Sequence, residues 1–205
     1  LTTQFHPTQM LADVMTVEEN FGHLDGIKLV FMGDARNNVA NSLMVVCAKM
    51  GMHFVACGPK ELWPSEELAN KCRKIANNTG GSIEMTDDVM EASKDADVIY
   101  TDVWVSMGEP DEVWNERINL LKPYQVNMDI MNNANSNAIF LHCLPSFHDL
   151  NTSIGKDIYD KFGIKEMEVT DEVFTSSKSK VFDEAENRLH TIKAVVYATM
   201  REDNE

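Results

Sequence analysis

The sequence lacks long apolar runs and has little positive charge. None of its stretches approaches the ~20 consecutive apolar residues that a membrane-spanning helix needs, and its first residues do not show the charged-then-apolar pattern of a secretion signal. The 205 residues include 18 Lys and Arg against 33 Asp and Glu, a formal net charge of −15. Because nucleic acids and anionic membranes bind basic surfaces, we expect neither as a partner.

The cysteines lack the spacing of a disulfide framework or of a zinc site. They are four in number and scattered: Cys47, Cys57, Cys72 and Cys143. Scattered cysteines of this kind are usually small buried apolar residues in a reducing compartment. We therefore expect a cytoplasmic protein with no structural metal and no disulfide.

Glycine-rich phosphate-binding motifs are absent as well. Gly33-Asp-Ala-Arg-Asn-Asn38 follows an expected strand and precedes an expected helix, where a dinucleotide fingerprint would lie. It lacks the later glycines that let the backbone approach a pyrophosphate, so we expect no nucleotide cofactor. What remains is a pair of amides, Asn37 and Asn38, suited to a carboxylate or another small anion at a helix amino end. The plainer alternative is that they only cap the helix.

What is present is a regular alternation of short apolar runs and amphipathic segments. Apolar runs predict strands at 28–32, 53–56, 83–85, 98–101 and 139–142. Helical periodicity predicts helices at 7–21, 39–50, from about 63–67 to 77–81, 86–94, 111–121, 126–133 and 156–162, with Thr86 capping the fourth. Strands that alternate with helices are typical of an α/β fold, here a Rossmann-like parallel sheet with helices on both faces.

Three of these strands run into polar loops. The first leads to Asn38, the fourth to Asp102 and the Ser106-Met107-Gly108 segment, and the last to Cys143-Leu144-Pro145. Ligands of open α/β sheets bind beyond the carboxyl ends of the strands, so we expect the three loops to converge on one crevice. Asp102 is placed either to bind a ligand ammonium or merely to cap a turn.

Cys143 has three interpretations. A cysteine directly after a buried strand is most often a core residue. It can also be the nucleophile of a cysteine–histidine pair, or a zinc ligand together with His148. No second ligand pair accompanies it in the sequence, so we do not predict a metal site.

Arg188 is unusual for its expected position. The final helix is predicted to begin at Asp183, with Glu186 as the partner in a capping box. Arg188 would then lie near the amino end of the helix, where the helix dipole disfavours a cation by ~0.3–1 kcal/mol. That placement indicates an anionic ligand or an acidic neighbour, the alternative being an ordinary surface ion pair.

Five segments, taken together and in this order, resemble the ornithine carbamoyltransferase family over essentially the whole chain. They are His6-Pro-Thr-Gln9, Gly33-Asp-Ala-Arg-Asn-Asn38, Asp102-Val-Trp-Val-Ser-Met-Gly108, His142-Cys-Leu-Pro145 and Glu186-Asn-Arg188. The Ser-Met-Gly loop and the His-Cys-Leu-Pro turn are the specific ones. The related aspartate carbamoyltransferases carry proline where Cys143 stands.

The resemblance implies a reaction and a set of residues. Members of the family transfer the carbamoyl group of carbamoyl phosphate to the side-chain amine of L-ornithine, giving L-citrulline and phosphate, without a cofactor. The ornithine ligands would be Asn38, Asp102, Ser106 and the backbone of Met107. The carbamoyl phosphate ligands would be His6, Pro7, Thr8, Gln9, Arg188 and the backbone of Cys143 and Leu144.

The resemblance also implies the catalytic groups. Arg188 and His6 would stabilise the oxyanion that forms as the amine attacks. The amine of ornithine, like that of lysine, has a free pKa near ~10.4 and must first lose a proton. Cys143, with Asp102 beside it, is the candidate for helping to accept that proton.

The chain departs from the family in one large respect. An earlier domain with a Ser-Thr-Arg-Thr-Arg type phosphate loop is absent, and the chain starts at Leu1 without a methionine. We therefore expect an interdomain helix in 1–22, an ornithine-binding domain in 23–182, and a second interdomain helix in 183–205. The apolar stripes of the two helices would partly face the missing domain. The full-length protein would be a homotrimer, and these residues alone would have little activity.

Two alternatives remain open at this stage. The chain could be a module that binds an amino acid without catalysis. It could also belong to a sister transferase acting on putrescine or on an acylated ornithine, although Asp102, Ser106 and Met107 favour a free α-amino acid. A nicotinamide-dependent dehydrogenase is disfavoured by the missing glycines.

Overall fold

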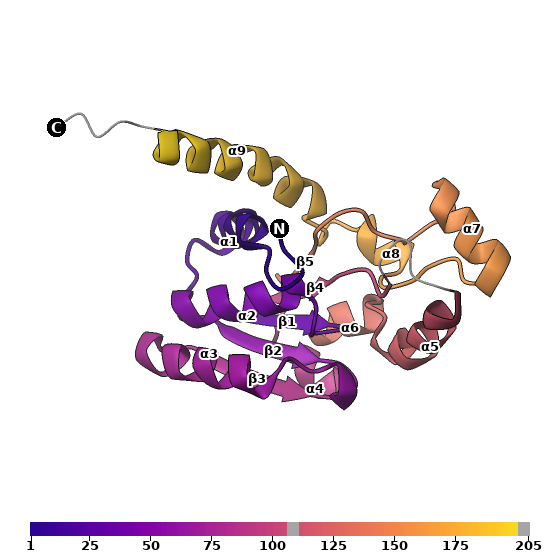
Figure 1. The fold of residues 1–205 in the computed structure, drawn as a ribbon, viewed down its shortest axis with the longest axis horizontal. Helices are drawn as coiled ribbons and strands as arrows, with labels where there is room; N and C mark the ends of the chain where they lie inside the picture. Colours follow the sequence, from indigo (N-terminus) through magenta and orange to yellow (C-terminus); the bar gives the residue numbers. More distant parts are fainter. Residues whose placement is uncertain (106–110, 201–205) are drawn as a thin grey trace.

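The computed structural model describes residues 1–105 and 111–200 and contains one parallel five-stranded sheet (Figure 1). The strands are β1 (Lys28–Met32), β2 (His53–Cys57), β3 (Ser82–Thr86), β4 (Val98–Thr101) and β5 (Ile139–His142). Their order across the sheet is β3-β2-β1-β4-β5. Met32 pairs with Thr101, which pairs with His142, so the carboxyl ends of β1, β4 and β5 are level. The predicted α/β fold with a parallel sheet is confirmed.

Helices cover both faces of the sheet. One apolar core lies between the sheet and α1 (Pro7–Phe21), α2 (Asn38–Met50) and α3 (Glu66–Thr79). The other lies beneath α4 (Val89–Ser93), α5 (Asp111–Leu121), α6 (Met128–Asn133), α7 (Ser153–Phe162) and α8 (Asp171–Phe174). Successive strand residues alternate between the cores, as Phe31 and Met32 do. In the part of the chain that the structure describes, no helix combines the length and apolar character needed to cross a bilayer.

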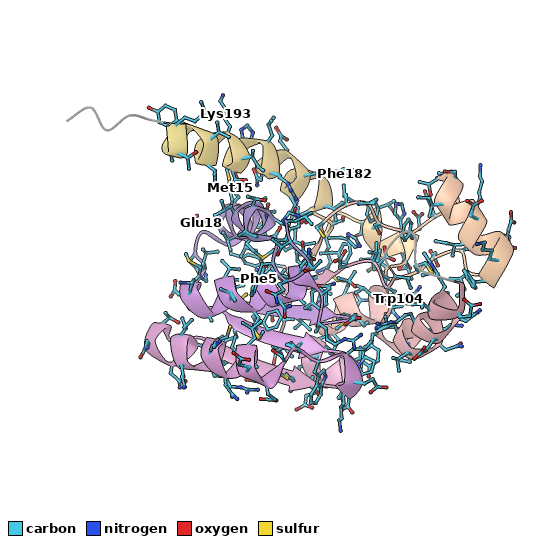
Figure 2. The ribbon with its side chains drawn as sticks, in the orientation of Figure 1. Phe5, Met15, Glu18, Trp104, Phe182 and Lys193 are labelled. Atoms are coloured by element: carbon cyan, nitrogen blue, oxygen red, sulfur yellow. The ribbon has the colours of Figure 1, made fainter. Side chains whose placement is uncertain are left out.

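The last helix, α9 (Val181–Met200), lies beside α1 at the edge of the molecule (Figure 1). Hydrogen bonds between side chains join the two helices, including one that Gln9 donates to Glu184. In Figure 2, Met15 of α1 lies on the side that faces α9, and Lys193 lies on the opposite side of α9. The first and last helices are therefore neighbours, although the whole sheet separates them in the sequence.

The start of α9 differs from the prediction. The helix begins at Val181, not at Asp183, and Glu186 is not its capping partner. Phe140 of β5 donates its backbone N–H to the carbonyl of Lys178 and accepts the backbone N–H of Lys180. These hydrogen bonds hold residues 178–180 along β5, so a tertiary contact sets where the helix begins. Arg188 consequently lies about two turns inside α9. The prediction that it lies near the amino end, where the helix dipole disfavours a cation, was therefore wrong.

Three other predicted helix starts were also wrong. The helix expected from Lys156, α7, begins at Ser153, because the hydroxyl of Thr152 caps it by accepting the backbone N–H of Gly155 at 3.0 Å. Asp88, not Thr86, caps α4, because its Oδ1 accepts the backbone N–H groups of Met90 and Glu91. Thr86 is instead the last residue of β3. The helix expected from residue 126 begins at Met128, since Val126 forms a parallel bridge with Val169.

Candidate active site

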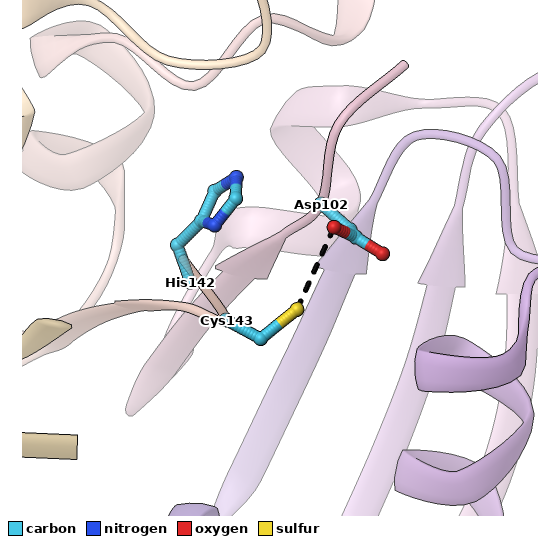
Figure 3. Close-up of side chains that lie close together, drawn as sticks. All are labelled: Asp102, His142 and Cys143. Carbon is cyan, nitrogen blue, oxygen red and sulfur yellow. Dashed lines mark hydrogen bonds between the residues drawn. The ribbon is translucent and has the colours of Figure 1, made fainter. Parts of the chain in front are cut away.

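Asp102 and Cys143 meet at the carboxyl ends of β4 and β5 (Figure 3). The thiol Sγ of Cys143 lies 3.5 Å from Oδ1 of Asp102. Oδ1 also accepts the backbone N–H of Val103 at 2.8 Å, and Oδ2 accepts the side-chain amide of Asn37 at 3.1 Å. Asn37 comes from the loop after β1, so all three strand-end loops converge, as the topology predicted.

Burial determines the protonation of this pair. Burial raises the pKa of the Asp102 carboxyl, while the charge of His142 and the bonds from Val103 and Cys143 act in the opposite direction. Burial, followed by the charge of Asp102, raises the pKa of the Cys143 thiol well above its ordinary value. At neutral pH Cys143 is therefore a thiol that donates to the carboxylate.

A second group of predicted residues surrounds a small cavity next to Cys143. Its volume is about 110 Å³, and its lining includes Gln9 from the first turn of α1, Leu144, and Arg188 from α9. The guanidinium Nη1 of Arg188 donates to Oε1 of Gln9 and lies 3.1 Å from Nε2 of His6. Three predicted residues from distant parts of the chain, His6, Gln9 and Arg188, thus lie together beside Cys143 and Leu144.

His6 is neutral in this arrangement. Burial lowers the pKa of its imidazole, and the adjacent positive charge of Arg188 lowers it further. Its backbone N–H donates to Oγ of Ser42 at 2.7 Å, which anchors the start of α1 on α2. Because Nε2 accepts from Arg188, His6 can donate from Nε2 to a ligand only after Arg188 moves away and the ring changes tautomer.

The remaining predicted ligands are less directly placed. Asn38 donates its side-chain amide to the backbone carbonyl of Thr2 at 2.8 Å, so its amide group is turned towards the amino-terminal segment. Pro7 is exposed as the first residue of α1, and Thr8 is half-buried beside it. Ser106 and Met107 lie outside the described residues.

Asn37 does more than sequence reasoning assigned to it. Its side-chain oxygen caps α2 by accepting the backbone N–H of Ala40 at 2.7 Å, as the plainer alternative predicted. The amide nitrogen of the same side chain donates to Asp102. One residue therefore both starts a helix and orients the acid of the site.

Sequence reasoning missed a buried ion pair behind Cys143. Nε2 of His142 lies 3.3 Å from Oε1 of Glu168, and neither side chain is exposed to solvent. Burial disfavours both charges, yet Glu168 raises the pKa of His142 and His142 lowers the pKa of Glu168. Glu168 lies 26 residues after His142 in an irregular segment, so no local pattern could have paired them.

Three side chains at the strand ends lie close enough together to share a metal ion. Ligand atoms of Asp102, His142 and Cys143 lie within 4.8 Å of one another. However, Glu168 raises the pKa of His142, and burial raises the pKa of the Cys143 thiol well above its ordinary value, so proton binding at both groups opposes metal binding. His148 belongs to a separate group with Asp149 and Asp171 and does not complete a site with Cys143. The absence of a metal stays a prediction.

A thiol and a cation that line a small cavity, with an acid in contact with the thiol, are suited to binding an amino acid beside a small polar group. Residues 25–199 match the family described as aspartate/ornithine carbamoyltransferase, Asp/Orn binding domain, and the chain belongs to this carbamoyltransferase family.

Its similarity to particular relatives points to the ornithine branch. The chain is 68% identical over 200 residues to "Ornithine carbamoyltransferase, catabolic" of Treponema denticola, covering 98% of this chain and 59% of that protein. It is 58% identical over 201 residues to the protein of the same name in Bacillus licheniformis, covering 98% of this chain and 60% of that protein. The ornithine carbamoyltransferase structure from Pyrococcus furiosus superposes with a TM-score of 0.83 at 42% identity, covering 95% of this chain and 56% of that one.

These comparisons confirm the family resemblance read from the motifs. They also show that the chain spans about three fifths of the length of the curated relatives it matches.

Proposed function

We propose that the protein to which this domain belongs transfers the carbamoyl group of carbamoyl phosphate to the side-chain amine of L-ornithine, yielding L-citrulline and phosphate. The observation that carries the proposal is the contact of Cys143 with Asp102 at the rim of the cavity that Gln9 and Arg188 line. It places an acid for an ammonium group next to hydrogen-bonding groups for a carbamoyl group.

The ornithine end of the site would use the loops after β1 and β4. The Asp102 carboxylate, oriented by Asn37, would accept hydrogen bonds from the α-ammonium group. Asn38, Ser106 and the backbone N–H of Met107 would donate to the α-carboxylate. A free α-amino acid satisfies both sets of groups, whereas putrescine has no carboxylate to bind the second set.

The carbamoyl phosphate end would use the first turn of α1 and the middle of α9. Gln9, His6 and the backbone of Cys143 and Leu144 would hold the carbamoyl group, and Arg188 would neutralise the developing oxyanion. Pro7 and Thr8 would contribute the amino end of α1, whose dipole favours an anion. The remaining phosphate ligands would come from a part of the protein outside these 205 residues.

The reaction requires a neutral amine. The side-chain ammonium of ornithine would lie beside Cys143 and give its proton to this pair, whose vacant proton site is the Asp102 carboxylate because Cys143 already carries a proton. The amine nitrogen then bonds to the carbamoyl carbon and the carbonyl oxygen takes up the negative charge. The bond to the phosphate oxygen breaks as the carbonyl re-forms, and the attacking nitrogen gives up its surplus proton to the departing phosphate. Arg188 stabilises the charged intermediate and the departing phosphate electrostatically.

The test is product formation by the full-length protein. With carbamoyl phosphate as donor, we expect citrulline from L-ornithine, and slower or no product from putrescine, N-acetylornithine and L-aspartate. A higher rate with putrescine would reassign the substrate. Calorimetric binding of ornithine without product from any acceptor would instead support a binding module.

The assembly and location of the protein are part of the same proposal. We propose a homotrimer, as the family resemblance implies, located in the cytoplasm, a reducing compartment that suits four free cysteines. Light scattering on the full-length protein should give three times the mass of one chain.

A further inference from the structure

Two carboxyl groups are buried together where α1, α9 and the sheet meet. Asp13 of α1 and Glu184 of α9 are each 1% exposed. Oε1 of Glu184 accepts the side-chain amide of Gln9 at 2.8 Å and the hydroxyl of Tyr100 at 3.1 Å. Oε2 accepts the backbone N–H of His142 at 3.0 Å. The Glu184 carboxylate is thereby supplied with donors from α1, β4 and β5.

Asp13 has a different environment. Its Oδ1 accepts from Nε2 of Gln9 at 2.8 Å, but its Oδ2 is buried without a donor among the described residues. A carboxylate oxygen left without a donor in an apolar core is costly, whereas a protonated Oδ2 can donate to Glu184. Burial and the charge of Glu184 both raise the pKa of Asp13 well above its ordinary value. Asp13 is thus the protonated member of the pair.

The pair determines which way the amide of Gln9 points. Nε2 of Gln9 donates to Asp13 and to Glu184, so Oε1 must face the opposite direction, where it accepts from Arg188. Rotation of the amide by 180° would put Oε1 against two carboxyl oxygens and a donor against the guanidinium, which is electrostatically unfavourable. Gln9 therefore presents an acceptor, not a donor, at this end of the cavity.

We propose that Asp13 and Glu184 are positioning residues, which share one proton and thereby orient the amide of Gln9. Gln9 in turn holds Arg188 and presents its side-chain oxygen to accept an N–H of the carbamoyl group. This inference rests on the proposed function. The carbonyl oxygen of Gln9 would accept from the amino group of carbamoyl phosphate, while Arg188 stays available for its oxygens. An acyl phosphate with a methyl group in place of that amino group, such as acetyl phosphate, has no donor to offer Gln9.

The first test is a matched pair of substitutions in the full-length protein. In Asp13→Asn, the new side-chain oxygen can accept from Gln9 and the new amide can donate to Glu184, which reproduces the pattern of the protonated acid. We expect its KM for carbamoyl phosphate to stay within about twofold of the unsubstituted protein. In Glu184→Gln, an amide nitrogen must face either the His142 N–H or the donors from Gln9 and Tyr100. We expect KM for carbamoyl phosphate to rise about tenfold or more, as for a lost charge-assisted hydrogen bond.

Three further readouts separate positioning from stability. A purely structural role would reduce the active fraction and hence kcat, with both KM values unchanged. Positioning predicts a raised KM for carbamoyl phosphate, an unchanged KM for ornithine, and a smaller preference for carbamoyl phosphate over acetyl phosphate as competing ligand. The infrared band of a buried protonated carboxyl should be present in the unsubstituted protein and lost in Asp13→Asn, a measurement that does not require Glu184→Gln to fold.

The outcomes are distinguishable. No citrulline from the unsubstituted protein would refute the proposed function. With an active protein, a tenfold rise in KM for Asp13→Asn, or absence of the protonated-carboxyl band, would overturn the positioning role. An unchanged KM for carbamoyl phosphate in folded Glu184→Gln would overturn it as well.

Discussion

At the scale of single residues, the site depends on charges that solvent does not reach. His142 and Glu168 are both fully buried and form an ion pair directly behind Cys143. Glu168 also accepts the backbone N–H of Phe147 at 2.6 Å and the hydroxyl of Ser146 at 2.9 Å. Through these bonds one carboxylate ties the end of β5 to the loop after Pro145.

Replacing Glu168 by Gln should destabilise the protein by about 3–5 kcal/mol, because it leaves His142 buried without its counter-ion. The contribution of His142, whose pKa is raised above 6.5, is complete below that pH and is lost as pH rises through the raised value. The contribution of Glu168, whose pKa is lowered below 4.5, is complete above that pH and is lost as pH falls through the lowered value.

The difference in unfolding free energy between the unsubstituted protein and Glu168→Gln should therefore be largest between pH 4.5 and 6.5 and narrow at alkaline pH. Denaturant titrations at several pH values measure it. Glu172→Gln, at an exposed position of α8, is the matched control and should change little. A pH-independent difference would contradict the ion pair.

At the scale of elements, helix starts also place groups of the site. The side chain of Asn37 caps α2 and donates to Asp102, whereas the side chain of Ser65 only caps α3, by accepting the backbone N–H of Leu68 at 3.3 Å. The two caps are comparable in kind, but only the first touches the site. They allow the stability of a helix to be separated from the orientation of the acid.

Asn37→Ala and Ser65→Ala should each lower the unfolding free energy by about 1 kcal/mol, the usual contribution of a capping side chain. Only Asn37→Ala should also raise KM for ornithine, by severalfold, because Asp102 loses a donor that orients it. Denaturant unfolding and steady-state kinetics of the full-length variants measure the two effects. Equal ornithine KM values in both variants would show that the Asn37–Asp102 bond does not affect binding.

At the scale of the whole molecule, α9 has an apolar side that stays exposed among the described residues. Its residues Leu189, Val196 and Met200 are 68%, 48% and 77% exposed, although they form the stripe expected from the sequence. Ala185, Leu189, Ile192 and Val196 contribute to an open groove along the helix next to Arg188. This face fits the proposal that α9 is an interdomain helix whose partner lies outside these residues.

We expect the purified 205-residue chain to form citrulline at least about a hundredfold more slowly than the full-length protein, because the proposed function assigns part of the phosphate ligands to residues outside it. Initial rates at matched concentrations measure this. Adding the remainder of the protein as a separate polypeptide is the control for correct folding and should restore activity. A rate close to that of the full-length protein would refute the division of the phosphate site.

The sequence by itself determined which segments form helices, which form strands, and which polar loops follow the strands. Apolar runs of three to five residues predicted all five strands, and periodicity predicted α1 and α5 with their observed bounds. These signals are local, since a strand or an amphipathic helix is encoded within its own residues. Five motifs taken together, three of them at strand ends, were sufficient to indicate the family. The loops at the strand ends were expected to converge because parallel strands bring their loops to one edge.

Tertiary structure decided which distant residues became partners. The pairs Asp13–Glu184 and His142–Glu168 and the start of α9 had no local signal. An acid in the first turns of a helix ordinarily faces solvent, and nothing within its own segment reveals that packing will bury it. Once it is buried, its charge must be paired or neutralised by whatever group the fold brings near. Which group lies next to the buried acid depends on how α1, α9 and β5 pack together, and no single one of these elements encodes it.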